Sequence, residues 1–331
     1  MQLAEGISVV VPNYNGRELL PLIIPAAFSA LRQAGLPYEV IIADDASTDG
    51  SVQWLNEAYP HVLVIASQQN RGFSATANMG IRAAGFQWIL LLNSDVILTP
   101  DYFEYLLSYR SYPNLLGVTG RMIGWEDEII QEAGKYPVMQ GAKIKTAYDF
   151  IPLDPSHSDR WPCFYLSGAN AFINKEVFDK IGHFNEVFSP FYAEDAELSL
   201  RAWRLGYASY YEHRAVCRHR QSATILSVQK KMAVDRVYNR NKFLLHAIHL
   251  QGVTLISWGV QLLLELLFRV LTLRPVILLS CIDFIKKIPE VRQSRRSLRN
   301  LHTDRKLAAV PDVFLQITMQ LPTDKITIFK R

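Results

Sequence analysis

Short apolar runs and longer amphipathic segments alternate along the first hundred residues of the chain. Runs rich in β-branched residues predict strands, and apolar residues at helical spacing predict helices. We therefore expect strands at 7–11, 38–43, 62–66 and in the apolar run 88–98, separated by helices at 18–34, up to Glu57, and from Phe73 to about Ala84. This alternation predicts an α/β fold with a doubly wound, mostly parallel sheet.

The pattern is less regular between residues 113 and 160, which are rich in Gly and Pro. Apart from a strand at 115–119, this segment predicts loops and short hairpins of the kind that cover a substrate site. Regular elements then resume as a strand-like run at 166–173, helices at 175–181 and 194–205, and strand fragments at 207–211 and 215–217.

The last third of the chain is different, because residues 243–264 contain no formal charge. The run is long enough to cross a membrane. However, polar side chains recur at every fourth position and form one stripe on a Leu-rich helix: Ser257, Gln261, Glu265 and Arg269. This amphipathic pattern predicts a helix that lies on a membrane surface, with the stripe facing water or headgroups.

Charge divides the chain at about the same place. Residues 1–224 hold 17 Lys+Arg and 24 Asp+Glu, whereas residues 225–331 hold 18 and 7. We therefore expect two regions, 1–224 and 225–331, with different partners. The basic positions that follow the apolar segments favour an anionic membrane surface: Lys286, Lys287, Arg292, Arg295, Arg296 and Arg299. A helical subdomain packed on the first region, or a homodimer contact, is the alternative, and no motif indicates nucleic-acid binding.

Composition excludes several classes of protein. The hydrophobic fraction of 49% and charged fraction of 20% are those of a globular protein. Cys163, Cys217 and Cys281 lie far apart and form no CxxC motif, which argues against a disulfide scaffold or a zinc site and favours a reducing compartment. No signal peptide is expected, because the N-terminus leads almost directly into a strand.

Candidate chemistry first appears where the run 88–98 turns polar, at Asn93 and Asp95. Ligands of open α/β sheets bind beyond the carboxyl ends of the strands. A hard divalent cation that bridges phosphates needs oxygen ligands there. A polar turn that leads into the helix after Pro100 is the alternative.

Five short motifs then occur in a family-like order and spacing: VVVPNYN at 9–15, DDASTDGS at 44–51, NRGF at 70–73 with NMG at 78–80, LNSD at 92–95 and EDAEL at 194–198. With these motifs, residues 5–224 resemble a family 2 glycosyltransferase of the GT-A fold, followed by a C-terminal α-helical extension. The resemblance implies an inverting transfer of a sugar from a nucleotide-diphospho-sugar, with Mg²⁺ or Mn²⁺ as cofactor.

The resemblance implies that Asp195 is the general base. An inverting transfer in one step needs a carboxylate opposite the leaving group, which takes the proton of the acceptor hydroxyl. Glu194 stands beside it, and Glu197 is the second candidate. The dipole at a helix start favours ionised carboxylates, so simple helix-terminal charge is the alternative role. The aromatic run at 188–192 resembles the acceptor wall of the family.

For the metal, the resemblance implies Asp95 as the main ligand. The family usually has Asp where this chain has Asn93, and a neutral amide is a weaker ligand, so contact with ribose or metal-bound water is the expected role of Asn93. In part of the family a histidine at the position of His219 completes the metal shell. A surface role for His219, or His213 as the ligand, is the alternative.

By the same resemblance, Asp44 accepts a hydrogen bond from the imide N–H of uracil or thymine, which implies a UDP or dTDP donor. A carboxylate only accepts, so it rejects a base with an acceptor at that position. Pro12 and Tyr14 would flank the base, and Arg71 would contact phosphate. Helix capping by Asp44 and solvent exposure of Arg71 are the alternatives. The remaining residues predicted to bind the nucleotide-sugar are Asn15, Asn78, Asn93, Ser94 and Gly168.

The family and the tail together imply a saccharide or lipid-linked saccharide acceptor in cell-surface polysaccharide synthesis. They also imply a hexosyl- or deoxyhexosyltransferase in the cytoplasm, peripheral on the inner face of the cell membrane. A catalytically weak sugar-nucleotide-binding or scaffold protein is one alternative, although Asp44, Asp95 and Asp195 together argue against it. A sugar-phosphate nucleotidylyltransferase is another, but it needs a Gly-rich basic loop that residues 12–15 lack.

Overall fold

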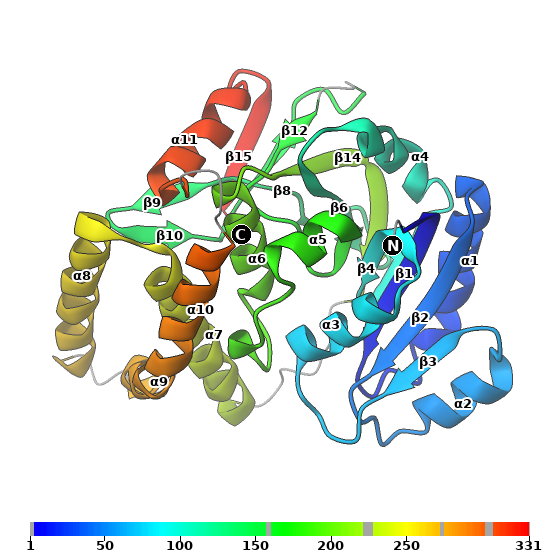
Figure 1. Cartoon of the computed structure of the whole chain (residues 1–331), viewed down its shortest axis with the longest axis horizontal. Coiled ribbons are helices and arrows are strands. Elements are labelled where there is room, and N and C mark those ends of the chain that lie inside the picture. Colours follow the sequence, from blue (N-terminus) through cyan, green and yellow to red (C-terminus); the bar gives the residue numbers. More distant parts are fainter. Residues whose placement is uncertain (1–2, 157–159, 221–227, 272–274, 302–306, 331) are drawn as a thin grey trace.

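A central mixed sheet organises the computed structural model, which describes residues 3–156, 160–220, 228–271, 275–301 and 307–330 (Figure 1). The strands of this sheet are β1 (Ala4–Asn13), β2 (Tyr38–Asp44), β3 (Leu63–Ala66), β4 (Phe86–Leu92), β5 (Val96–Leu98), β6 (Leu115–Gly124), β7 (Ile130–Glu132), β12 (Trp161–Pro162), β13 (Asn170–Asn174) and β14 (Ala208–His219). Their order is β12-β14-β6-β13-β4-β1-β2-β3, with β5 beside β14 and β7 beside β6.

The block from β3 to β4 is wholly parallel, as the alternation of strands and helices predicted. Beyond it β13 runs antiparallel to both β4 and β6, whereas β6 and β14 are parallel. Two small sheets lie outside the main one. They are the hairpin of β9 (Val138–Gln140) and β10 (Lys143–Lys145), and the sheet of β8 (Gly134–Lys135), β11 (Tyr148–Pro152) and β15 (Ile326–Lys330).

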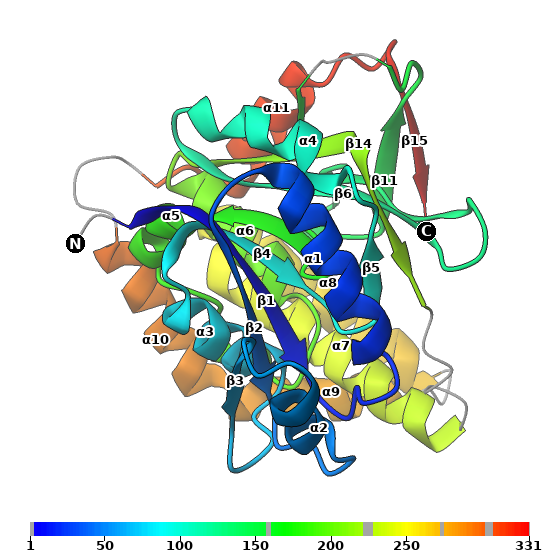
Figure 2. The same cartoon turned by 90° about the vertical axis from the view of Figure 1, so that its right-hand side faces the viewer.

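Helices cover both faces of the sheet. The helices of the described residues are α1 (Leu20–Ala34), α2 (Ser51–Ala58), α3 (Phe73–Ala83), α4 (Tyr102–Leu106), α5 (Lys175–Ile181), α6 (Glu194–Arg204), α7 (Val228–His249), α8 (Gly252–Leu271), α9 (Pro275–Lys286), α10 (Ile288–Asn300) and α11 (Val310–Gln320), with short 3₁₀ turns η1 (Leu107–Ser111) and η2 (Glu186–Phe188). Of these, α8 and α9 pack on other helices at the edge of the molecule (Figure 1). In Figure 2, α1 lies in front of the central strands.

Alternate residues of β4 serve two separate cores, because successive side chains of a strand point to opposite faces. Ile89 and Leu91 join the core that contains α3 and α6, while Leu90 and Leu92 join the core under α1 and α4. All four side chains are fully buried, as expected of a central parallel strand.

Three predicted elements differ from the structure. The run 88–98 is two strands, because β4 ends at Leu92 and β5 pairs with β14 after a turn. Within 166–173 only the end is a strand, since β13 begins at Asn170. The fragments at 207–211 and 215–217 form one strand, β14, with a register shift between Glu212 and Val216.

The C-terminal helices share the core of the sheet region. Leu244 and Ile248 of α7, Val291 of α10 and Ile317 of α11 belong to the same buried cluster as α3 and α6. The chain then returns to pair β15 with β11. The predicted boundary after residue 224 lies in 221–227, outside the described residues.

Helix α8 turns its polar face toward the protein and its apolar face outward, which is the opposite of our expectation. Its polar stripe faces the hairpin β9–β10: Gln261 Oε1 accepts from the N–H of Ala142 at 3.1 Å, and Glu265 forms an ion pair with Lys143. The expectation that these two side chains face water or headgroups is therefore wrong, because the hairpin supplies polar partners for them. The outward face is apolar instead, and it comprises Val253, Ile256, Val260, Leu263, Leu264, Leu267 and Phe268.

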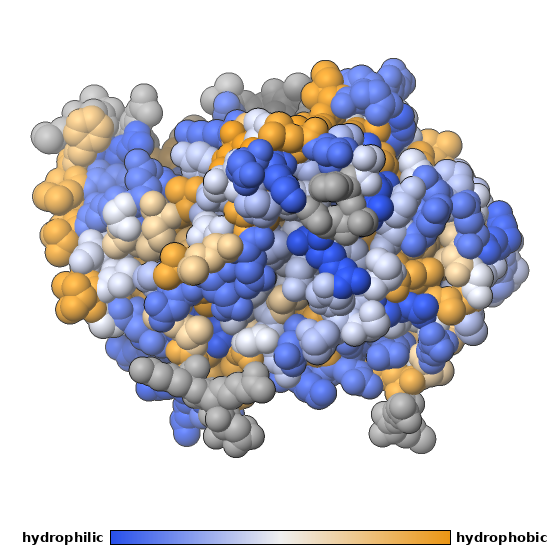
Figure 3. Space-filling model, turned by 90° about the horizontal axis from the view of Figure 1, so that it is seen from above, coloured by the Kyte–Doolittle hydropathy of each residue, from blue (hydrophilic) through white to orange (hydrophobic). Residues whose placement is uncertain are grey.

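The left edge of Figure 3, where α8 lies, accordingly carries a group of apolar residues. Val253 is 79% exposed, and the least exposed members of this face, Val260 and Leu267, are 55% exposed. Among the described residues one helix is long and apolar enough, by length and composition, to cross a membrane, and it is this one, over Gly252–Arg269.

Candidate active site

A cavity of about 550 Å³ opens where β1 and β4 end and α3 begins. Carboxyl ends of parallel strands converge here, which is where α/β sheets bind ligands. Its lining comes from five segments of the chain and comprises Pro12, Asn13, Tyr14, Asp45, Asn70, Gly72, Phe73, Thr76, Asn93, Ser94, Asp95, Pro190 and Phe191. Five predicted site residues therefore line one cavity: Pro12, Tyr14, Asn93, Ser94 and Asp95.

The two predicted metal ligands lie side by side. Nε2 of His219 is 3.4 Å from Oδ2 of Asp95, because β14 pairs with β5 directly after the LNSD turn. On the other side of the ring, Nδ1 lies 2.6 Å from Oε1 of Gln131. An amide oxygen only accepts, so Nδ1 carries a proton. When the ring is protonated Nε2 donates to Asp95, and in the neutral ring the lone pair of Nε2 is free for a cation.

This arrangement fits a divalent cation. A histidine that binds a metal usually donates its other ring N–H to an oxygen, as His219 does to Gln131. Burial lowers the pKa of His219, but the hydrogen bond and charge of Asp95 and the charge of Glu132 outweigh it, so the pKa is raised. In the described part of the chain no group of three or more His, Cys, Asp or Glu side chains could hold a metal alone. A cation here would therefore depend on substrate phosphates, as Mg²⁺ commonly does.

His213, the competing ligand, faces elsewhere. Its Nδ1 contacts the hydroxyl of Tyr211 at 2.8 Å, and its Nε2 contacts Arg121 at 3.0 Å. Burial, and secondarily the charge of Arg121, lowers the pKa of His213 to about 4.

The carboxylate that lines the cavity beside β2 is Asp45, not Asp44. Asp44 is 1% exposed, and its oxygens accept from Asn13 Nδ2 at 2.8 Å and from the hydroxyl of Ser47 at 2.6 Å. It thus ties the ends of β1 and β2 together. Asp45 accepts from the backbone N–H groups of Arg71 and Gly72, at 2.8 and 2.9 Å, and faces the cavity.

Three residues predicted to bind the nucleotide-sugar serve other contacts. Asn15 accepts from the N–H of Thr48 at 2.8 Å, and its backbone N–H donates to Ser47. Asn78 is buried and exchanges two hydrogen bonds with the backbone of Phe184. Arg71 is 51% exposed and forms an ion pair with Glu186 at 2.9 Å. None of the three lines the cavity.

The predicted base stands at the start of α6, beside the cavity wall. Oδ1 of Asp195 accepts from the N–H of Ala196 at 2.7 Å, and Oδ2 accepts from that of Gly168 at 3.4 Å. A Cβ at Gly168 would be 3.4 Å from Phe73, a lining residue, and 3.7 Å from Cβ of Asp195. Gly168 therefore lies between the cavity wall and Asp195.

Burial raises the pKa of Asp195, and the charge of Glu132 adds to this, while the N–H groups of Ala196 and Gly168 oppose it. A raised pKa suits a general base that works near neutral pH. Burial also raises the pKa of Glu194 to about 8, with the charge of Asp195 as the second cause. Glu194 therefore holds its proton at neutral pH.

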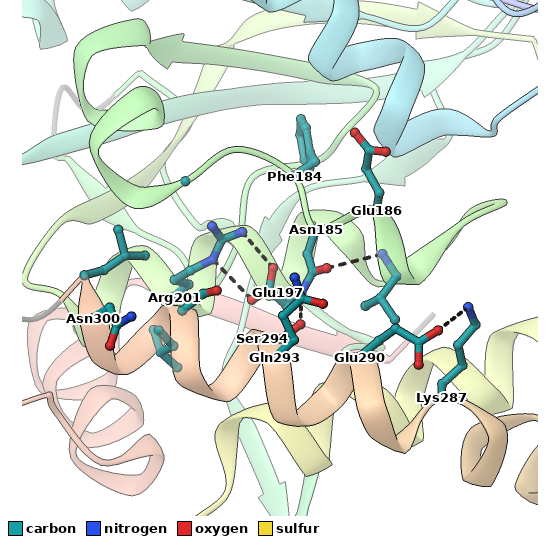
Figure 4. Close-up of a pocket in the computed structure, with 15 residues that line it drawn as sticks. Phe184, Asn185, Glu186, Glu197, Arg201, Lys287, Glu290, Gln293, Ser294 and Asn300 are labelled. Carbon is teal, nitrogen blue, oxygen red and sulfur yellow. Dashed lines mark hydrogen bonds and ion pairs between the residues drawn. The ribbon is translucent and has the colours of Figure 1, made fainter.

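Glu197 is tied into a buried network. Its oxygens contact Arg201 at 2.8 Å and Nε2 of His249, on α7, at 3.2 Å. Burial alone would raise the pKa of Glu197, but Arg201 and His249 lower it to about 2. Glu197 and Arg201 line a separate cavity of about 700 Å³ between α6 and α10 (Figure 4). Glu197 therefore faces a different cavity from that of Asp95, whereas Asp195 stands beside the wall of the latter.

Several residues at the site escaped the sequence analysis. Asp45, Asn70 and Phe73 lie inside the DDASTDGS and NRGF motifs, and Thr76 lies between NRGF and NMG, so their neighbours along the chain could have indicated them. Gln131 lies in the irregular segment 113–160, where no periodicity marks it. Its role depends on the pairing of β7 with β6 and of β6 with β14.

Comparison with known proteins identifies the family of the chain. The family model described as glycosyl transferase family 2 matches residues 8–182, more than half of the chain. The chain belongs to this family.

Its relatives include enzymes named for lipid-linked substrates. The N-acetylglucosaminyl-diphospho-decaprenol L-rhamnosyltransferase of Mycobacterium tuberculosis is 26% identical over 209 residues, which are 56% of this chain and 67% of that protein. The undecaprenyl-phosphate 4-deoxy-4-formamido-L-arabinose transferase of Pectobacterium carotovorum is 32% identical over 111 residues, 32% of this chain. The match spans about a third of the length of the latter enzyme, 34%.

Solved structures share the fold at low sequence identity. GalNAc-T7 with UDP, GalNAc and Mn²⁺ superposes with a TM-score of 0.61 at 12% identity, over 95% of this chain and 57% of that one. The mannosyltransferase PcManGT of Pyrobaculum calidifontis, with GDP-Man and Mn²⁺, gives 0.50 at 14% identity, over 96% and 86%. At such identities the likeness concerns the fold, which is that of GT-A glycosyltransferases with added C-terminal helices.

Proposed function

We propose that this protein transfers a sugar, with inversion, from a UDP- or dTDP-sugar to a hydroxyl of a lipid-linked saccharide. The observation that carries the proposal is the pair Asp95 and His219, oriented by Gln131 at the edge of the strand-end cavity. Membership of glycosyl transferase family 2 supports the reaction class, and the names of the relatives support a lipid-linked acceptor.

Each side chain has a defined task in this proposal. Asp95 and His219 hold Mg²⁺ or Mn²⁺, which supplies charge neutralisation for the departing diphosphate. Pro12 and Tyr14 flank the base. Asp44 and Asp45 are the two candidate acceptors for the imide N–H of the base. Asp195 takes the proton of the attacking hydroxyl, since its raised pKa favours proton uptake near neutral pH. Asn93 and Ser94 line the cavity beside these groups.

Purified protein with Mn²⁺ and a panel of UDP-, dTDP- and GDP-sugars tests the proposal. Slow release of the nucleoside diphosphate from one or two uridine or thymidine donors is expected, and a polyprenyl-diphosphate-linked saccharide should accelerate it. Release from GDP-sugars alone would overturn the base assignment. No release and no metal-dependent nucleotide binding would favour a scaffold role.

For its location, the proposal places the protein on the inner face of the cell membrane, through the outward face of α8. Seven apolar side chains of α8 are exposed together. On α9 and α10, Lys286, Arg292, Arg296 and Arg299 are also exposed, and such charges favour anionic lipid. Because Gln261 and Glu265 bind the hairpin β9–β10, α8 is attached along its side and lies on the bilayer.

Vesicle flotation separates the alternatives for this face. Binding to anionic vesicles that exceeds binding to neutral ones supports the membrane surface. A stable dimer without vesicle binding would assign the face to a second copy. Resistance to alkaline carbonate, with both ends of α8 accessible from opposite sides, would mean that the helix crosses the membrane.

A further inference from the structure

The segment between η2 and α6 forms one wall of the active site. Pro190 and Phe191 line the cavity, and the chain continues through Tyr192 and Ala193 directly to Asp195. Tyr192 and Ala193 have φ values of 78° and 69°, in the left-handed region that residues other than glycine rarely adopt. Such a backbone persists only when its surroundings hold it.

Helix α7 supplies the groups that hold it. The side chain of Asn241 is fully buried, and its Nδ2 donates to the carbonyls of Phe188 at 2.5 Å and of Phe191 and Tyr192, each at 2.8 Å. These contacts fall on both sides of Pro190. One amide group of α7 therefore fixes the turn that leads to α6.

Arg240, the neighbouring residue, completes the clamp. Its Nη2 donates to the carbonyl of Ser189 at 2.5 Å. With Asn241, the two side chains thus engage four of the five carbonyls between residues 188 and 192.

The same segment is fixed from two other directions. On the cavity side, the N–H of Phe73 donates to the carbonyl of Pro190 at 2.8 Å, and a Cβ at Gly72 would be 2.8 Å from the Pro190 backbone. Just before η2, Nδ2 of Asn185 donates to the hydroxyl of Ser294 on α10 at 2.9 Å (Figure 4). The C-terminal helices and the start of α3 therefore hold opposite sides of one wall.

We propose that Asn241, assisted by Arg240, is a positioning residue for the acceptor reaction. It acts through the backbone of 188–193, which sets where Phe191 and Asp195 stand relative to the donor cavity. The inference rests on the glycosyltransferase function proposed above. It makes the C-terminal helices part of the active site as well as a means of attachment.

The chemistry of the amide makes the proposal testable. Nδ2 offers two N–H donors without charge, whereas an aspartate of the same shape offers only acceptor oxygens. Oδ1 of Asn241 accepts from Nε of Arg240 at 2.9 Å, and an aspartate can keep this contact. Its other oxygen, in place of Nδ2, would face three carbonyl oxygens, while Asn241→Ala only removes the side-chain amide. If donation to the wall is the role, Asn241→Asp is the more damaging change. If only packing matters, the isosteric aspartate is the milder one.

The experiment uses the full chain with Asn241→Asp, Asn241→Ala, Arg240→Ala and the control Asn239→Asp. Asn239 lies on the same helix, and no side-chain hydrogen bond of it is described. Three readouts apply: UDP and dTDP affinity with Mn²⁺, acceptor-dependent kcat and KM, and hydrogen exchange of residues 188–196. We expect Asn241→Asp to lower acceptor-dependent kcat/KM by about 10²-fold, the usual cost of a misplacement near 1 Å. Nucleotide affinity and the Asn239→Asp control should stay near wild type.

Faster exchange confined to 188–196 in both Asn241 variants would support the clamp. Wild-type kcat/KM in Asn241→Asp, or a smaller loss than in Asn241→Ala, would overturn it. If Asn241→Asp does not fold, Arg240→Ala and Asn241→Ala decide by the same exchange measurement. A wild type without turnover or nucleotide binding would instead refute the glycosyltransferase function, and the exchange data would still test the clamp.

Discussion

β4 and α8 are both apolar segments with polar neighbours, yet they present those neighbours differently. At β4 the polar residues follow the end of the strand, and Asn93, Ser94 and Asp95 all line the cavity. At α8 the polar side chains Gln261 and Glu265 face the protein, and the apolar side chains face outward. The local sequence determines where a strand of a parallel sheet ends. Which face of a helix points inward depends instead on the elements that pack beside it.

The largest expected effect is in the sheet region. Asp195→Asn should lower kcat by about 10²–10⁴-fold, because the amide cannot take the proton of the acceptor hydroxyl. Donor affinity should stay near wild type in calorimetry. Asp235→Asn, on the exposed part of α7, is the control. Near-normal transfer by Asp195→Asn would remove this carboxylate from the mechanism.

The next effect concerns a residue outside the sequence motifs. Gln131→Ala should weaken Mn²⁺-dependent nucleotide binding by about 10–100-fold, the usual cost of losing the partner of a metal-binding histidine. The residue fixes the ring of His219, and it does not line the cavity. Titration of Mn²⁺ at constant UDP measures the change. Unchanged Mn²⁺ affinity would argue that His219 is not a ligand.

In the C-terminal region, Leu263→Asp should weaken binding to anionic vesicles by about tenfold or more, since one Leu side chain inserted into hydrocarbon contributes about 1.5–3 kcal/mol. Leu22→Asp, on the exposed side of α1, is the matched control and should leave vesicle binding unchanged. Flotation at fixed salt measures both. Equal losses in the two variants would mean that α8 has no special place on the membrane.

A smaller effect should appear in the pH dependence of stability. In the folded protein burial raises the pKa of Glu194 to about 8, above its ordinary 4.5. Glu194 therefore contributes stability below pH 4.5, and this contribution is lost as the pH rises through about 8. As the pH rises from 4.5 to about 8, the melting temperature of Glu194→Gln should therefore fall less than that of wild type. A parallel decline of both proteins would contradict the buried, protonated carboxyl.

Sequence patterns could predict the sheet block and the place of the site. The continuous apolar run of β4 and the polar residues after it require only the local sequence. The sequence analysis proposed Asp44, whereas its neighbour Asp45 lines the cavity. The turn after β2 decides which of the two side chains faces the cavity, and the local sequence does not show this. The sequence could place Asn78 and Glu197 on helices. It could not identify their hydrogen-bond partners, Phe184 and His249, because these lie more than 50 residues away along the chain.

The C-terminal region shows why long-range contacts limit predictions from sequence patterns. The amphipathic pattern of α8 was correct, but the hairpin β9–β10 that pairs with its polar stripe lies in the irregular segment 113–160. Nothing in the periodicity of α7 marks Asn241 as the partner of residues 188–192. The charge asymmetry predicted two regions with different partners and left a packed helical subdomain as the alternative. In the structure, C-terminal helices share a core with the first region, and β15 pairs with one of its strands.

The most direct test of the account is nucleotide binding by calorimetry, with UDP and dTDP, with and without Mn²⁺. Wild type should bind one of them more tightly with Mn²⁺ than without. Asp95→Ala should lose this difference and keep its metal-independent affinity, because Asn93 cannot replace a carboxylate. Asp101→Ala, outside the cavity, should behave as wild type. Equal metal-dependent affinity in Asp95→Ala and wild type would contradict a metal-assisted nucleotide-sugar site at the end of β4.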